Sequence, residues 1–455
     1  MRGQETLFGR RRAGILAHVT SLPGPADHGR LDEDACRFID FLARSGFTVW
    51  QTLPVGPVNA TGSPYQSTSL FAGNSALLPQ VSVQQSKHDY EYFLQDQAYW
   101  LEDYALYCAL QGEQGGVPWY RWPVLLRDRD AASLEAARAR LGVRMETVRR
   151  EQYDFFSAWD RLKTYAHAAG VHLFGDVPMF AAHDSADVWA HREFFCIDHE
   201  GRMTEVAGAP PDAFAPEGQD WGCPQYRWDA LARDGYRWWI ERFQLQASLF
   251  DILRVDHFRG FEASWHVPAA LPPGGGRWEP VPGDALFSAV RAALGSLALV
   301  AEDLGHITPA VQALRSRLGL PGMHVLQFAF DGAGDNPHLP HNHSANGVAY
   351  TGTHDNDTTL GWWQALSEDA RSRVRAYLDY PEEPMPWPLV HAALASVCDL
   401  AMLPLQDCLG LDGAARMNTP GKVEGNWRWR CPPGVLNDAL QEQFLALAKL
   451  YGRDD

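Results

Sequence analysis

Three acidic residues stand where short apolar runs of the sequence end. They are Asp256, Glu302 and Asp355, in Ile-Leu-Arg-Val-Asp-His-Phe-Arg-Gly, Leu-Val-Ala-Glu-Asp-Leu-Gly and Tyr-Thr-Gly-Thr-His-Asp-Asn-Asp. Such runs are typical of buried parallel strands, and the residues that follow the strands of a parallel barrel meet at one rim. Paired carboxyl groups at such a rim are the groups that break and form glycosidic bonds.

Asp256 has an arginine two positions before it. Side chains two apart on a strand point to the same side, so Arg254 and Asp256 are both expected to face the barrel lumen. An adjacent guanidinium favours the ionised carboxylate, which a nucleophile at an anomeric carbon requires. The alternative is a structural Arg–Asp pair without a chemical role.

Glu302 emerges from the apolar run Leu-Ala-Leu-Val-Ala. Desolvation raises the pKa of a carboxyl group, so Glu302 is predicted to stay protonated and to act as a general acid and then as a base. The alternative is that Glu302 or its neighbour Asp303 caps the following helix.

His354 and Asp355 follow a Thr-Gly-Thr turn in which Gly352 lets the backbone bend. An imidazole and a carboxylate together can hold adjacent sugar hydroxyls, contacts that strengthen as the ring flattens toward an oxocarbenium ion. A hydrophilic loop or a weak cation site is the alternative for this segment.

Further polar and aromatic residues fall at predicted strand ends and loops. Asp176, in Gly-Asp-Val-Pro, is expected to orient Arg254 or a sugar, with a turn-forming Asp before Pro as the alternative. Tyr65, in Ser-Pro-Tyr-Gln, and Trp221, in Asp-Trp-Gly, offer flat faces for glucosyl units, with simple loop packing as the alternative for each.

The elements that must position these residues are eight apolar or β-branched runs separated by segments with helical periodicity. Strands alternating with helices favour a parallel sheet, and eight of them favour an α/β fold of the (β/α)8 TIM-barrel type spanning 1–455 as one catalytic domain. The predicted strands are Ala13–His18, Thr48–Leu53, His172–Pro178, Ile252–Phe258, Leu297–Leu304, Met323–Phe330, Val348–His354 and Ala414–Pro420.

Uneven spacing predicts two insertions in this barrel. Residues 54–171 are expected to form a helix-rich subdomain after the second strand, and residues 179–240 a loop-rich one that follows the third strand and covers the cleft. After the eighth predicted strand a helix is expected from Pro433 to Tyr451, and no C-terminal β-domain is expected.

Composition narrows the classes of partner. The 455 residues are 46% hydrophobic and 21% charged, as in globular proteins, and the net charge of −17 disfavours nucleic acid and anionic membranes. Seven cysteines without a Cys-x-x-Cys pair indicate reduced thiols in the cytoplasm. No stretch has the length of a membrane span, and nucleophile-elbow, phosphate-loop, dinucleotide and metal-ligand spacings are missing, so neither cofactor nor metal is predicted.

Long motifs along nearly the whole chain resemble the 4-α-glucanotransferases known as amylomaltase or disproportionating enzyme, relatives of the α-amylase superfamily. They include Ser63-Pro64-Tyr65-Gln66-Ser67, Gly208-Ala209-Pro210-Pro211-Asp212, Arg254-Val255-Asp256-His257-Phe258-Arg259-Gly260, Ala301-Glu302-Asp303-Leu304-Gly305 and Tyr350-Thr351-Gly352-Thr353-His354-Asp355-Asn356. The resemblance implies transfer between maltooligosaccharides and other α-1,4-glucans by a retaining double displacement, with an α-glucan hydrolase or an inactive glucan-binding protein as alternatives.

The resemblance also assigns roles to residues. It implies Asp256 as the nucleophile, Glu302 as the acid/base and Asp355 as the transition-state stabiliser, the first two about 5 to 5.5 Å apart. The implied substrate-binding residues are Ser63, Tyr65, Asp176, Trp221, Arg254 and His354. The loop from Gly208 to Trp221 is expected to close over the acceptor side, and Cys223 departs from the Asn that is usual in the family.

Overall fold

The fold is built on a sheet of eight parallel strands. The computed structural model describes residues 7–24, 28–79, 87–211, 215–422 and 424–454. The strand order is β10-β11-β12-β1-β2-β3-β6-β9. The strands are β1 (Arg12–Leu16), β2 (Val49–Gln51), β3 (His172–Val177), β6 (Ile252–Val255), β9 (Leu299–Ala301), β10 (Gly322–Val325), β11 (Gly347–Tyr350) and β12 (Leu400–Pro404).

This sheet curls into a barrel. Its two outer strands approach each other where the Ala301 N–H donates to the Pro321 carbonyl just before β10, at 2.9 Å. Alternate strand residues fill the interior with a buried apolar layer: Val49, Phe174, Ile252, Val300, Met323, Val325, Val348, Tyr350, Leu400 and Met402. The predicted (β/α)8 TIM barrel is therefore confirmed.

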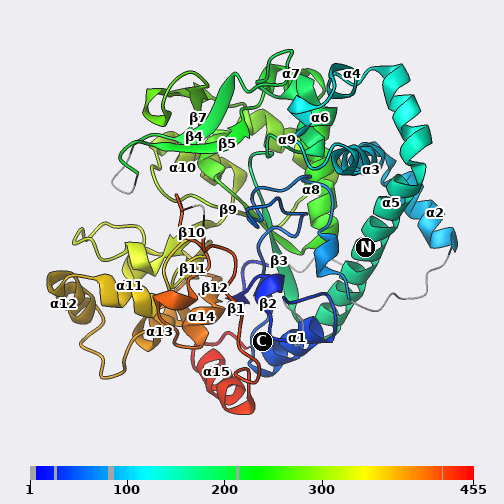
Figure 1. The fold of residues 1–455 in the computed structure, drawn as a ribbon. Coiled ribbons are helices and arrows are strands. Elements are labelled where there is room, and N and C mark those ends of the chain that lie inside the picture. The colour runs from blue at the N-terminus through cyan, green and yellow to red at the C-terminus, as the bar shows by residue number, and fades with distance from the viewer. Residues whose placement is uncertain (1–6, 25–27, 80–86, 212–214, 423, 455) are drawn as a thin grey trace.

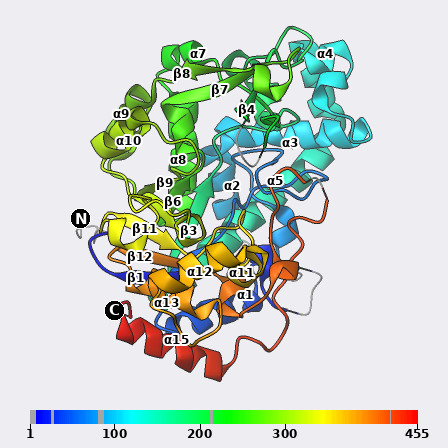
Figure 2. The same cartoon turned by 90° about the vertical axis from the view of Figure 1, so that its left-hand side faces the viewer.

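Helices surround the strands (Figures 1 and 2). Figure 1 shows the red C-terminal helix α15 beside the blue α1, because β1 pairs with β12 and brings the two ends of the chain together. The helices are α1 (Glu33–Arg44), α2 (Lys87–Asp96), α3 (Ala98–Glu113), α4 (Val124–Arg127), α5 (Ala131–Ala168), α6 (Ala186–Ala190), α7 (Trp228–Arg233), α8 (Arg237–Leu249), α9 (Gly283–Leu294), α10 (Pro309–Leu318), α11 (Thr359–Ala365), α12 (Glu368–Tyr377), α13 (Trp387–Ala395), α14 (Leu405–Cys408) and α15 (Asp438–Leu450). No described helix combines the length and the apolarity that crossing a membrane requires.

The prediction of the eighth strand was wrong. The strand is β12 at 400–404, whereas 414–420 contains the end of a short 3-10 helix, η9 (Gly413–Ala415), followed by a loop. The apolar run of β12 lies only four residues after α13, so the two merge into one apolar stretch in the sequence. The other seven predicted strands each contain or overlap an observed one.

The long connections after β2 and β3 differ in character. Between β2 and β3 lie α2 to α5, and α5, with 38 residues, descends along the right of Figure 1 to the start of β3. The segment predicted to be loop-rich contains β4 (Glu205–Ala209) and β5 (Gln219–Pro224). These pair with β7 (Ala263–Pro268) and β8 (Arg277–Pro280) in the antiparallel order β5-β4-β7-β8. Strands from either side of β6 thus share one small sheet above the barrel, which the sequence did not indicate.

Candidate active site

Charged residues form the layer directly above the apolar interior of the barrel. Each of three adjacent strands has a buried apolar residue and, two positions later, a charged residue. Because side chains alternate along a strand, the charged residue lies on the same face as the apolar one. Asp176 follows Phe174, Arg254 follows Ile252, and Glu302 follows Val300. Strand alternation therefore directs all three toward the barrel axis at the carboxyl ends of the strands, where barrels of this type hold their active sites.

Arg254 connects the acids of this layer. Its Nη1 lies 2.6 Å from Asp176 Oδ2 and 3.0 Å from Asp256 Oδ1, and its side chain is almost completely buried. Burial raises the pKa of Asp176, and the Arg254 charge opposes that rise. The predicted proximity of Arg254, Asp256 and Asp176 is confirmed, and the arginine fixes the orientation of both carboxylates.

Glu302 lies in a pocket made by backbone groups. Its Oε2 accepts a hydrogen bond from the His257 N–H at 2.7 Å, and its Oε1 accepts one from the Leu304 N–H at 3.2 Å. Burial raises the pKa of Glu302 to about 8, and the nearby Asp256 and Asp303 carboxylates contribute. A carboxyl group with such a pKa is protonated at neutral pH, as its apolar sequence context predicts.

Helix capping does not account for either acid after β9. The following helix α10 is capped by Thr308, whose hydroxyl accepts from the Val311 N–H. Asp303 instead pairs with Arg315 at 2.7 Å and accepts from the Met323 N–H at 2.8 Å. Asp303 thereby ties β10 to β9, and Glu302 stays available to the cleft.

Asp355 lies in the open part of the site. Its side chain is 43% exposed, and its Oδ2 lies 3.3 Å from His354 Nε2. Asn418 donates to its Oδ1 at 2.6 Å, and Arg416 donates to its backbone carbonyl at 2.6 Å. The sequence did not indicate a role for Asn418 or Arg416, because residues 414–420 were predicted to form a strand.

Tyr65 joins the two sides of the site. Its hydroxyl donates to Asp176 Oδ2 at 2.7 Å and lies 2.9 Å from His354 Nε2, and its ring stacks on His354 with centroids 5.3 Å apart. Trp427, whose centroid is 6.0 Å from that of Tyr65, adds a third ring. Trp427 was also missed, although the sequence Asn-Trp-Arg-Trp at 426–429 is an aromatic signal.

Trp221 and Ser63 take different places. The Trp221 ring packs edge-on against His257 at 4.8 Å, and its carbonyl accepts from Gln66 Nε2 at 2.9 Å, so it borders the site. The Ser63 hydroxyl accepts from the Tyr65 N–H at 3.3 Å and thus shapes the turn that presents Tyr65. Cys223 is buried, with Sγ 3.5 Å from Gln66 Nε2. Of the segment from Gly208 to Trp221, residues 212–214 lie outside the described residues.

A hollow adjoins the Asp355 side of these residues. It encloses about 430 Å³, part of it open to solvent. Its walls include His18, Thr353, His354, Arg416, Met417 and Trp429. Polar and aromatic walls beside a carboxylate and an imidazole suit a ligand rich in hydroxyl groups. The arrangement as a whole brings an acid, a carboxylate held by an arginine and a third carboxylate to the same end of the barrel, near the rings of Tyr65 and His354.

Comparison with known proteins decides among the glucan-active classes. A family model described as 4-alpha-glucanotransferase matches residues 17–87 and 79–437. The 4-alpha-glucanotransferase of Thermus thermophilus is 44% identical over 97% of this chain and 99% of its own length. The chain belongs to the 4-alpha-glucanotransferase family. The 4-alpha-glucanotransferase of Synechocystis is 41% identical over 98% of this chain and 99% of its own length.

Solved structures agree with the assignment to the 4-alpha-glucanotransferase family. The amylomaltase from Streptococcus agalactiae in complex with acarbose superposes with a TM-score of 0.94 at 30% identity, covering 98% of this chain and all of that one. A second amylomaltase, from Corynebacterium glutamicum, has a TM-score of 0.79 at 17% identity and shares the fold. The transferase interpretation is therefore favoured over the α-glucan hydrolase and the inactive binding protein.

Proposed function

We propose that this 4-alpha-glucanotransferase moves a segment of a 1,4-α-glucan to the 4-hydroxyl of glucose or of another glucan by a retaining double displacement. Asp256 attacks the anomeric carbon while Glu302 protonates the leaving 4-oxygen, giving a β-glucosyl–enzyme intermediate. Glu302, now ionised, takes the proton from the incoming 4-hydroxyl, which displaces Asp256. Asp355 and His354 hold hydroxyls of the flattened ring.

The observation that carries this proposal is the contrast between the two central carboxyl groups. Glu302 is half-buried, and desolvation raises its pKa to about 8, so at neutral pH it holds the proton that the leaving oxygen needs. Asp256 is held by Arg254 at 3.0 Å, and a quarter of its side chain is exposed toward the cleft. An acid beside a fixed carboxylate is the pair that retaining transfer requires.

Buried polar atoms around these groups suit sugar hydroxyls. Within the described part of the chain, Asp176 Oδ1 and His257 Nε2 are buried without a hydrogen-bond partner. A glucosyl hydroxyl can donate to the carboxylate oxygen and can also bond the imidazole nitrogen. We propose that Asp176 contributes to the subsite that holds the transferred glucosyl unit and that His257, beside Trp221, contributes to the acceptor side.

The partner classes and the subdomains are part of the same proposal. Maltooligosaccharides and other α-1,4-glucans are the substrates, and the net charge of −17 supports the exclusion of nucleic acid and anionic membranes. Seven unpaired thiols support a cytoplasmic location. Residues 54–171 form a helix-rich subdomain, and 179–240 cover the cleft; the contacts of Trp221 with Gln66 and His257 support that cover.

Preference for a sugar acceptor over water is the property to measure. Pure protein is incubated with maltotriose, the products are separated by chromatography, and total reducing ends are followed in parallel. Glucose and a ladder of longer maltodextrins at constant reducing ends are expected. Rising reducing ends without longer chains would indicate a hydrolase, and no change in either would indicate a binding protein. Glu302→Gln, expected to retain only residual activity, is the reference, and exposed Glu442→Gln is the matched control.

A further inference from the structure

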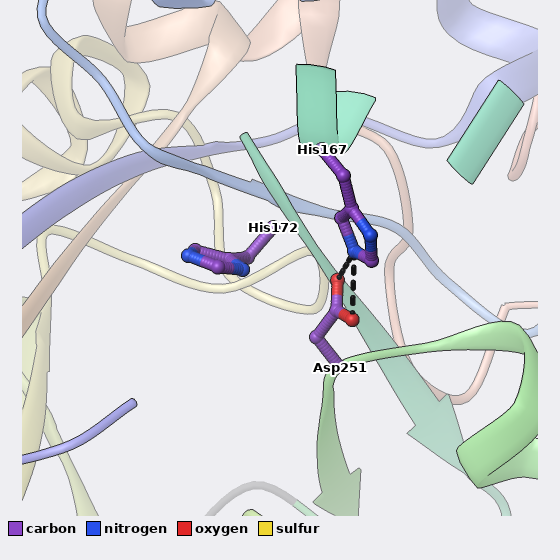
Figure 3. Close-up of side chains that lie close together, drawn as sticks. All are labelled: His167, His172 and Asp251. Atoms are coloured by element: carbon purple, nitrogen blue, oxygen red, sulfur yellow. Dashed lines mark hydrogen bonds and ion pairs between the residues drawn. The ribbon is translucent and has the colours of Figure 1, made fainter. Parts of the chain in front are cut away.

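A histidine–aspartate cluster lies at the opposite end of the same strands that carry the active site. It consists of His167 at the end of α5, His172 at the start of β3 and Asp251 immediately before β6 (Figure 3). One ligand atom from each side chain lies within 4.8 Å of those of the other two. Asp176 comes four residues after His172, about 13 Å along a strand, so this cluster is separate from the cleft.

We propose that His167, His172 and Asp251 bind a divalent transition-metal ion, with Zn²⁺ the best fit. Two imidazoles and one carboxylate are the donor set that Zn²⁺ takes, with water as the fourth ligand, whereas Mg²⁺ and Ca²⁺ prefer oxygen ligands alone. His167 Nε2 already lies 2.9 and 3.0 Å from the two Asp251 oxygens. Ligand atoms of tetrahedral zinc lie roughly 3.3 Å apart, so the third ligand needs to approach by about 1.5 Å at most.

Backbone hydrogen bonds to Leu173 hold the Asp251 carboxylate of this cluster in place. Asp251 Oδ2 accepts a hydrogen bond from the Leu173 N–H at 2.8 Å, and the Asp251 N–H donates to the Leu173 carbonyl at 2.8 Å. Such outer contacts orient a ligand and leave its other oxygen for the metal. His167 has a side chain that is 44% exposed, which gives it room to close on an ion.

One neighbouring charge opposes binding. Lys163 Nζ lies 3.7 Å from Asp251 Oδ1 while donating to the Ser248 carbonyl at 2.9 Å. An ammonium group at that distance repels a divalent ion and competes for the same oxygen. The bound ion would join the end of α5 to the starts of β3 and β6, and so stabilise the floor of the barrel.

The test is titration of the metal-stripped full-length protein with Zn²⁺ by calorimetry, with Co²⁺ absorption as a second readout. One ion per chain is expected, with visible bands of tetrahedral Co²⁺. His172→Gln and His167→Gln should each weaken binding by at least about tenfold, because even the loss of a residue that only supports a ligand costs about that much. Exposed His199→Gln should leave the affinity unchanged. Lys163→Met should tighten binding by about tenfold. Unchanged maltotriose transfer verifies that each variant is folded.

Three outcomes would overturn the proposal. They are wild-type binding no tighter than millimolar, His172→Gln binding as tightly as wild type, and an affinity that does not rise in Lys163→Met. Since no catalytic residue is changed, these results are independent of the proposed transfer mechanism.

Discussion

Two arginines are buried at opposite ends of the barrel, and they differ in what they bind. Arg254, near the carboxyl end of β6, contacts Asp176 at 2.6 Å and Asp256 at 3.0 Å. Arg453, after α15, donates instead to backbone carbonyls near the amino ends of the strands. These acceptors, between 2.7 and 3.4 Å away, belong to Leu394, Arg12, Asp399, Ser396 and Cys398.

The difference separates chemistry from stability. Carbonyl oxygens have no proton to exchange, so Arg453 can only join the chain segments that meet below β1 and β12. The carboxylates around Arg254 face the cleft, and their orientation decides whether a sugar can react. In barrels of this type the carboxyl ends of the strands carry catalysis, and the amino ends carry stability. The contrast can be sharpened or broken by four measurements.

The largest effect is expected for Glu302→Gln. The amide keeps the shape and can still accept from the His257 N–H, but it cannot deliver a proton to the leaving oxygen. Loss of general acid–base catalysis should lower kcat with maltotriose by about 10²–10⁴-fold. Product chromatography at saturating substrate measures this change, with Glu442→Gln as the matched surface control. A kcat equal to that of the control would remove Glu302 from the mechanism.

Arg254→Lys is expected to come next. Lysine keeps the charge, but its shorter side chain ends before the position of Arg254 Nη1, the nitrogen that contacts both Asp176 and Asp256. Displacement of the nucleophile Asp256 by about 1 Å should lower kcat on the order of 10²-fold. Comparison of kcat with KM separates orientation from substrate affinity. If only KM rises, Arg254 is a binding residue and the contrast with Arg453 weakens.

The pH profile should report the pKa of Glu302. Because burial raises that pKa to about 8, the acid is protonated below this pH and loses its proton as pH rises through it. The wild-type kcat/KM, which reports ionisation of the free enzyme, is therefore expected to fall above about pH 8, by about tenfold per pH unit. The residual activity of Glu302→Gln should lack this alkaline limb. An identical limb in both proteins would assign it to another group.

Much of the site followed from strand alternation, whereas residues outside the strands did not. Arg254, Asp256 and Glu302 lie at strand ends that apolar runs mark in the sequence, so their convergence was predictable. Asn418 and Trp427 reach the cleft from an irregular loop, where periodicity carries no signal. The strand β12 was missed because it follows α13 so closely. For the same reason Asn418 was placed in a strand, whereas it lies in a loop after the last strand of the barrel.

Long-range pairing explains the rest of what the sequence left open. The small sheet joins β4 to β7, whose residues lie on either side of β6, and nothing local encodes that pairing. His167 and Asp251 are likewise far apart in sequence, so their spacing matches no metal motif. The contacts of Arg453 depend on the closure of β1 against β12, and only the fold brings these segments together.

The smallest effect is expected for Arg453→Lys, in stability rather than in activity. Lysine cannot reach all the carbonyls that the guanidinium joins, and hydrogen bonds from a charged group contribute about 1.5–3 kcal/mol each. Replacement should lower the free energy of unfolding by about 2–4 kcal/mol. A chain of this length gains roughly 1 kcal/mol/K of entropy on unfolding, so Tm should fall by about 2–4 °C. Calorimetry measures this fall, and kcat with maltotriose should stay at the wild-type value, because Arg453 binds at the end of the barrel opposite the cleft. A variant with unchanged Tm and reduced kcat would reverse the assignment of the two arginines.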